Sequence, residues 1–74
     1  MTRTTDGHTT TISNDDTREA GVYWLNSRQH GQWMAAFGRL DRDGSFVCHC
    51  RKPSRTYKSE RAAERAAVRW ASLN

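Results

Sequence analysis

The most closely spaced potential metal ligands of this 74-residue sequence are Cys48, His49 and Cys50. Structural zinc sites need four ligands, which commonly come as two pairs with Cys-x-x-Cys or similar spacing. The spacing here is Cys-x-Cys, which on a strand places both thiols on one face and the imidazole on the other. The remaining histidines, His8 and His30, lie in polar segments. We therefore expect no metal, and two reduced cysteines that pack in the core as small apolar side chains.

Residue patterns typical of catalysis are missing from the sequence. It holds no nucleophile motif of the Gly-x-Ser-x-Gly type and no glycine-rich phosphate loop before its expected helix. Asp41 and Asp43 lie in an Asp-Gly turn, where aspartate is common for structural reasons. A chain this short buries only about 60% of its unfolded surface, so an enclosed catalytic pocket is not expected. We predict that the protein is not an enzyme and uses no cofactor.

The basic side chains are the feature of the sequence that best indicates what kind of partner the protein binds. The chain has 12 Lys+Arg against 8 Asp+Glu, a net charge of +4. Residues 1–19 carry 2 − 4 = −2 and residues 20–74 carry 10 − 4 = +6, so the later part is the basic one. Cations at strand ends and in loops would contact nucleic-acid phosphates, although ordinary surface charge explains them equally well. The candidate nucleic-acid-binding residues are Arg28, Arg39, Arg51, Lys52, Arg55 and Lys58.

Three strands and one helix are expected to position these side chains. Residues 21–25, 32–40 and 46–51 are rich in apolar, β-branched and aromatic residues, and Asp43-Gly44 indicates a hairpin between the last two strands. A polar turn is expected over residues 26–31, and residues 56–58 could extend the sheet. Pro53 ends the third strand because it cannot donate to a ladder.

Residues 59–73 form the expected helix. Ser59 is a good N-cap, and an apolar stripe runs along one face at i, i+3, i+4, i+7 spacing. The stripe consists of Ala63, Ala66, Ala67 and Trp70. Arg61, Arg65 and Arg69 form a basic ridge beside the stripe, and a solvated face is favoured over a ridge that follows phosphates. The predicted fold class is therefore α+β: a three-stranded antiparallel β-meander with one C-terminal helix packed on one face.

The first 19 residues are expected to be a disordered tail, and the domain is expected to span residues 20–74. Seven of these 19 are threonine, and Ile12 is the only large aliphatic residue. Such a segment has little apolar surface to offset its ordering entropy. A less favoured alternative is that residues 9–12 add an edge strand, because Thr and Ile suit strands.

Both faces of the second strand carry apolar residues, although the chain supplies only one helix to cover them. Trp33, Ala35 and Phe37 are expected to face the helix. The opposite face needs another cover: the segment around Ile12, a second copy of the chain, or a partner protein. Strand twist and long neighbouring side chains could also hide part of it. The candidate interface residues on this uncovered face are Tyr23, Leu25, Met34, Ala36 and Leu40.

Short motifs over residues 21–71 resemble a known family. Residues 31–37, Gly-Gln-Trp-Met-Ala-Ala-Phe, are similar to the Gly-Lys-Trp-Val-Ala-Glu-Ile stretch of plant ethylene-response-factor DNA-binding domains. Tyr57-Lys58-Ser59 with Ala63 resembles that family's entry into its helix, and Gly21-Val22 resembles its opening. The arm-binding domains of phage tyrosine integrases share this architecture. The resemblance implies a three-stranded sheet that enters the DNA major groove with the helix packed behind it.

The positions that read bases in the plant family are apolar in this sequence. They correspond to Ala36 and Gly38 on the second strand and to Tyr23 and Leu25 on the first. Base readout normally uses Arg, Asn, Gln or Lys on the reading element. The resemblance therefore supports the fold better than it supports the family's mode of recognition.

Two functions follow from these patterns. The first is a non-enzymatic DNA-binding module, for example an accessory protein of a phage or mobile element, that contacts the phosphate backbone. The alternative is a protein-binding module, as a homodimer or as an inhibitor of a larger nucleic-acid machine. The sequence has no secretory signal and no apolar run of the roughly 20 residues that span a bilayer, so we expect a cytoplasmic protein without membrane contact.

Overall fold

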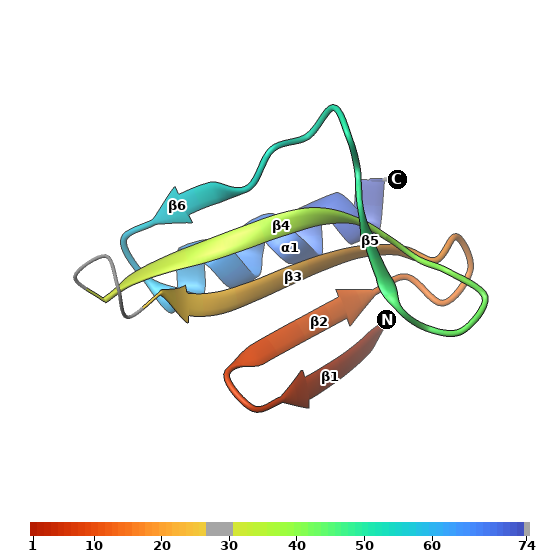
Figure 1. Ribbon diagram of the computed structural model, residues 1–74, viewed down its shortest axis with the longest axis horizontal. Coiled ribbons are helices and arrows are strands. Elements are labelled where there is room, and N and C mark those ends of the chain that lie inside the picture. The colour runs from red at the N-terminus through yellow and green to blue at the C-terminus, as the bar shows by residue number, and fades with distance from the viewer. Residues whose placement is uncertain (27–30, 74) are drawn as a thin grey trace.

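The computed structural model describes residues 1–26 and 31–73. This part of the chain folds as an α+β domain in which one C-terminal helix packs against an antiparallel sheet of six strands (Figure 1). In chain order the elements are β1 (Thr2–Asp6), β2 (Thr9–Ser13), β3 (Glu19–Asn26), β4 (Gln32–Leu40), β5 (Phe46–Cys48), β6 (Arg55–Tyr57) and α1 (Glu60–Leu73). The predicted class is correct, but a three-stranded meander undercounts the strands.

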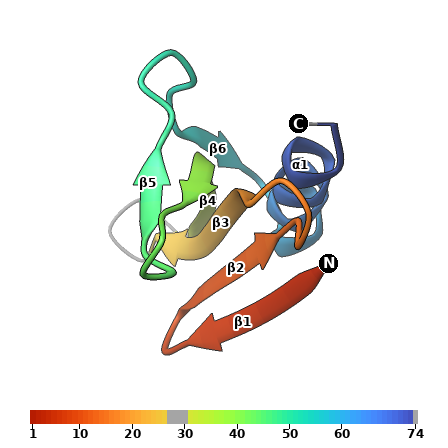
Figure 2. The same ribbon diagram turned by 90° about the vertical axis from the view of Figure 1, so that its right-hand side faces the viewer.

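The sheet has the order β1-β2-β3-β4, and the far edge of β4 is shared by two short strands. At one end β5 pairs with β4 through Gly38 and Cys48, and at the other end β6 pairs with it through Trp33 and Tyr57. Figure 2 shows α1 on one side of β3 and β4, with β5 standing on the side away from the helix. The sheet therefore has one face under α1 and an opposite face that α1 does not cover.

The prediction of a disordered tail before residue 20 is wrong, because residues 2–13 form the β1–β2 hairpin. β2 pairs along β3, and Ile12, opposite Gly21, is only 3% exposed. The hairpin thus satisfies the backbone groups of the β3 edge and inserts its one large aliphatic side chain into the core. Pairing with β3 and burial of Ile12 together offset the conformational entropy that the threonine-rich segment loses when it becomes ordered. The domain consequently does not begin at residue 20, and the less favoured strand over residues 9–12 is observed.

Helix α1 lies close to the sheet because the residues between them are small. Ala63, Ala67 and Ala71 are fully buried on the sheet-facing side. A Cβ atom added at Gly21 would lie 2.5 Å from Ala67 Cα, so the glycine is what lets the two backbones approach. The expected N-cap is confirmed, since Ser59 Oγ accepts a hydrogen bond from the Ala62 backbone N–H at 3.2 Å.

The aromatic side of the core faces the helix as predicted. Trp33, Ala35 and Phe37 all pack into the helix-side cluster, although Trp33 is only partly buried. The Phe37 and Trp70 ring centroids are 5.8 Å apart, and Trp70 Nε1 donates to Gly38 O at 2.9 Å. These contacts attach the C-terminal half of α1 to β4.

The β4–β5 hairpin is also confirmed, but its second strand is shorter than the expected 46–51. Asp41 Oδ1 accepts hydrogen bonds from the backbone N–H groups of Asp43 and Ser45, and Gly44 has a φ of 82°. The strand then ends at Cys48, and the chain turns before residues 55–57 return to β4. The expected turn over residues 26–31 lies mostly outside the described residues.

Candidate nucleic-acid interface

A groove of about 510 Å³ runs between α1 and the segment that leads from β5 into β6. We call it the basic groove. Its lining consists of Phe37, Lys52, Arg55, Tyr57, Arg65, Ala66, Arg69, Trp70 and Leu73. Two kinds of side chain therefore meet in it: long cations and aromatic rings.

The charge of the basic groove has a single sign. Four cations line it, Lys52 and Arg55 from the β6 side and Arg65 and Arg69 from α1, and no carboxylate does. Within the described residues, ion pairs form elsewhere and none of these four takes part in one. Four cations on two facing walls without a counter-charge in the lining create a positive local potential, which attracts anions.

The helix, strand β6 and the turn after β5 each contribute cations to the groove. Arg65 and Arg69 are one helical turn apart on the side of α1 that borders β6. Arg55 pairs with Ala35 of β4 and so projects from the sheet face that α1 covers. Lys52 comes from the turn after β5, and its Nζ lies 5.4 Å from the centroid of the Phe37 ring.

The groove floor is aromatic. Tyr57 and Trp70 are each partly buried, so part of each ring remains accessible along the groove. The imidazole of His49 lies edge-on to Trp70, with 5.6 Å between the ring centroids. The site can thus offer stacking surfaces between its cationic walls.

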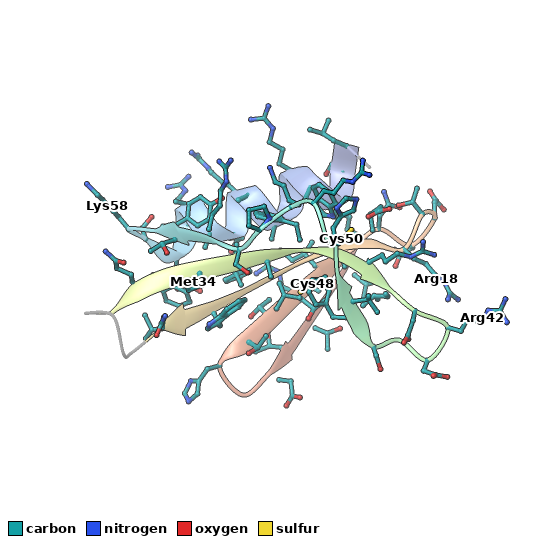
Figure 3. The ribbon with its side chains drawn as sticks, turned by 45° about the horizontal axis from the view of Figure 1, so that its top comes forward. Arg18, Met34, Arg42, Cys48, Cys50 and Lys58 are labelled. Carbon is teal, nitrogen blue, oxygen red and sulfur yellow. The ribbon has the colours of Figure 1, made fainter. Side chains whose placement is uncertain are left out.

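The structure brings together only some of the six predicted nucleic-acid-binding residues. Lys52 and Arg55 line the basic groove. Arg51 is exposed in the turn beside it, and Lys58 extends from the end of β6 (Figure 3). Arg39 is exposed and pairs with Val47 of β5, outside the groove lining. Arg28 lies outside the described residues.

Arg65 and Arg69 line the groove but are not among the site residues predicted from the sequence. The sequence shows their i, i+4 spacing, but such a row of arginines is more often a solvated helix face than a binding site. Arg65 and Arg69 share a groove with Arg55, because β6 pairs with β4 and thereby faces the arginine ridge of α1. That pairing joins residues that are 20 to 24 positions apart in the sequence, and it leaves no local signal there.

The predicted interface on the uncovered sheet face was partly misassigned. Tyr23 pairs with Ala35, is only 2% exposed and lies under α1, and Leu25 pairs with Trp33 on that same face. The error is one of register, because shifting a strand by one residue exchanges its two faces. Met34, Ala36 and Leu40 do lie opposite the helix. On that face, which we call the open face, their neighbours are Val22, Trp24 and Phe46.

The open face carries no basic side chain from the described strands. The strand arginines are Arg3, Arg39 and Arg55, and the pairing register places each of them on the helix side. A sheet that enters the major groove through its exposed face needs polar or basic readers there. The positively charged surface of this sheet is the other one, at its border with α1.

The two cysteines are free, as expected, but they are exposed rather than packed in the core. Cys48 pairs with Gly38 at the sheet margin and Cys50 follows the end of β5. The core prediction failed because Cys48 is on the open face, which α1 does not cover, and Cys50 lies beyond the end of β5. Among the described residues no three His, Cys, Asp or Glu side chains gather in a way that could hold a metal ion.

A second polar cluster ties the N-terminal hairpin to α1. Arg3 Nη1 donates to Tyr23 Oη at 3.0 Å and to Glu64 Oε2 at 3.3 Å. Tyr23 Oη in turn donates to Glu64 Oε2 at 3.3 Å. The hydrogen bond from Arg3 is the main reason why the pKa of Glu64 lies below its ordinary value of 4.5. This pair neutralises two charges on α1 and β1 outside the basic groove.

Comparison with protein-family models, with curated proteins and with solved structures finds no match to this chain. The resemblance to ethylene-response-factor and integrase arm-binding domains therefore stays a prediction. None of the described residues belongs to a helix with the length and apolar character needed to cross a bilayer.

Proposed function

We propose that this protein is a non-enzymatic nucleic-acid-binding module, and that the basic groove holds the phosphate backbone. The observation that carries the proposal is the set of four cations on two facing walls with no carboxylate in the lining. Guanidinium groups bind phosphate oxygens in a bidentate manner, and a row of them gives affinity without sequence choice. DNA is the proposed partner, and a cytoplasmic location stays a prediction.

Salt dependence tests this proposal with a matched pair of variants. Fluorescence anisotropy of a labelled DNA oligonucleotide is measured over a series of salt concentrations. Each phosphate contact contributes a log–log slope of about −0.9 for duplex DNA and about −0.7 for a single strand. The double variant Arg65→Ala, Arg69→Ala should therefore weaken binding and flatten the slope by about 1.4 to 1.8.

The control is the double variant Arg42→Ala, Arg61→Ala, which removes the same charge outside the groove lining. Arg42 lies at the end of the molecule opposite to Lys58 (Figure 3), and Arg61 is on α1, so the control includes one of the two Arg→Ala changes in the helix. This control should keep most of the slope. Equal losses in both variants would show that net charge alone drives binding and would contradict a site in the groove.

Protein binding through the open face is the second candidate function. One observation favours it: Trp24, Met34, Leu40 and Phe46 are only partly buried on a face that α1 does not cover. A second copy of the chain is the simplest occupant, and sedimentation equilibrium tests it. A concentration-dependent mass that falls to the monomer value in Leu40→Glu supports this function, whereas a monomer at every concentration removes the homodimer.

A further inference from the structure

We infer that the basic groove selects single-stranded nucleic acid, with phosphates on its cationic walls and bases stacked on Tyr57 and Trp70. This inference rests on the proposed function and specifies its substrate class. Three properties of the molecule support it: the aromatic floor, the two-walled arrangement of the cations, and the chemistry of the open face.

The aromatic floor distinguishes a single strand from a duplex. In a duplex both faces of each base are occupied by stacking, and only base edges reach the grooves. An unpaired base keeps a free π-face, which stacks on an aromatic side chain and adds affinity for every base so placed. Tyr57 and Trp70 are partly buried and line the groove, and Trp70 is held by its hydrogen bond to Gly38 O and by its contact with the Phe37 ring. A duplex could not use these two surfaces.

The cations surround the floor instead of forming one flat patch. Arg65 and Arg69 stand on the α1 wall, while Arg55 and Lys52 stand on the opposite wall. A groove with a charged wall on each side can follow one backbone, which is the arrangement that single-strand-binding proteins use. The two backbones of a duplex would meet only the rims of such a groove. The positions of the charges thus favour one strand lying along the axis of α1.

The open face lacks the side chains that a sheet uses to recognise a duplex. A sheet that docks in the major groove presents basic or amide side chains on its exposed face. Here the register turns all three strand arginines toward the helix side and leaves Trp24, Met34 and Phe46 on the open face. Because of this register, Arg55 lies on the helix side, where it lines the groove, and not on the open face.

The test compares three fluorescein-labelled probes with the wild-type chain at one salt concentration. They are an oligothymidine strand of about twelve nucleotides, an abasic strand with the same number of phosphates, and a hairpin duplex of similar length. Stacking of even one base predicts that oligothymidine binds at least about fivefold more tightly than the abasic strand. It should also bind more tightly than the duplex, and it should quench the intrinsic tryptophan fluorescence where the abasic strand does not.

Variants of Tyr57 separate stacking from charge. Tyr57→Leu should reduce the ratio of the affinity for oligothymidine to the affinity for the abasic strand. Tyr57→Phe keeps the ring and should keep the preference, so it is the matched control. If Tyr57→Leu does not fold, Trp70→Phe provides the second readout, because it should abolish the quenching by oligothymidine while Trp24 and Trp33 remain.

The outcomes distinguish this inference from the function on which it rests. Equal affinity for oligothymidine and the abasic strand, or tighter binding of the duplex, overturns the single-strand inference and leaves a phosphate-binding groove. Failure to bind any probe even at low salt overturns both. Poly-glutamate that competes as well as oligothymidine at equal charge overturns both as well, because the occupant would then be an acidic polypeptide.

Discussion

Gly21 sets how closely α1 approaches the sheet, and its replacement gives a first prediction. In Gly21→Ala the new Cβ would lie 2.5 Å from Ala67 Cα and 2.6 Å from Ala67 Cβ, so the helix must move. We expect the free energy of unfolding to fall by about 1–3 kcal/mol, which is the usual cost of overpacking a core. Urea denaturation followed by circular dichroism measures it. An unchanged midpoint would show that α1 does not pack on β3 at this position.

Glu64 makes stability depend on pH in a direction that follows from its partner. The Arg3 hydrogen bond holds the pKa of Glu64 below 4.5 in the folded state, so the unfolded state takes up the proton first. The stabilisation is therefore complete above pH 4.5 and is lost as the pH falls through the lower folded pKa. Glu64→Gln should be less stable than wild type at neutral pH, and the difference should shrink on acidification. Denaturation midpoints measured over a pH series test this, and a constant difference would contradict the coupling.

The N-terminal hairpin is an element of the fold, and Ile12 is the residue that tests it. Ile12 is 3% exposed within the helix-side core, so Ile12→Ala should cost about 2–5 kcal/mol. Thr4→Ala is the control, because Thr4 is exposed on the edge strand β1. Urea denaturation of both variants gives the difference. If residues 1–19 were a detached tail, the two variants would be equally harmless.

The start of α1 depends on one hydroxyl. Ser59 Oγ accepts from the Ala62 N–H, and its loss in Ser59→Ala leaves that donor without its cap. We expect a destabilisation of about 1 kcal/mol. Ser54→Ala, in the exposed loop before β6, should change the unfolding midpoint very little. A loss of the same size in both variants would mean that the effect does not come from capping.

The elements that sequence analysis predicted correctly are those with local signals. The Ser59 cap, the alanine stripe and the Asp-Gly hairpin each lie within a few residues of the structure they specify. The β1–β2 hairpin was missed because its stability comes from pairing with β3, which no composition rule for residues 1–19 reports. Two of the four cations in the basic groove, Lys52 and Arg55, are predicted from their positions in a loop and at a strand end. Arg65 and Arg69 join them only because β6 pairs with β4, and this pairing has no local signal in the sequence.

At the scale of the whole molecule, the two sheet faces have opposite chemistry. The helix side carries the strand arginines and the four cations of the groove, while the open face carries partly buried apolar side chains. The two candidate functions therefore use different surfaces. This separation allows them to be tested independently by variants that change the net charge by the same amount.

Arg69→Ala and Leu40→Glu each lower the net charge by one, but on opposite faces. If the groove binds the backbone, Arg69→Ala should weaken binding of a labelled oligonucleotide and flatten the salt slope by about 0.7 to 0.9. Leu40→Glu adds only distant repulsion, so its slope should match that of wild type, provided that circular dichroism confirms a folded chain. Sedimentation of the same two proteins reports on the open face, where only Leu40→Glu should alter self-association, because it places a charge in an apolar contact. A slope that changes equally in both variants would place nucleic-acid binding outside the groove.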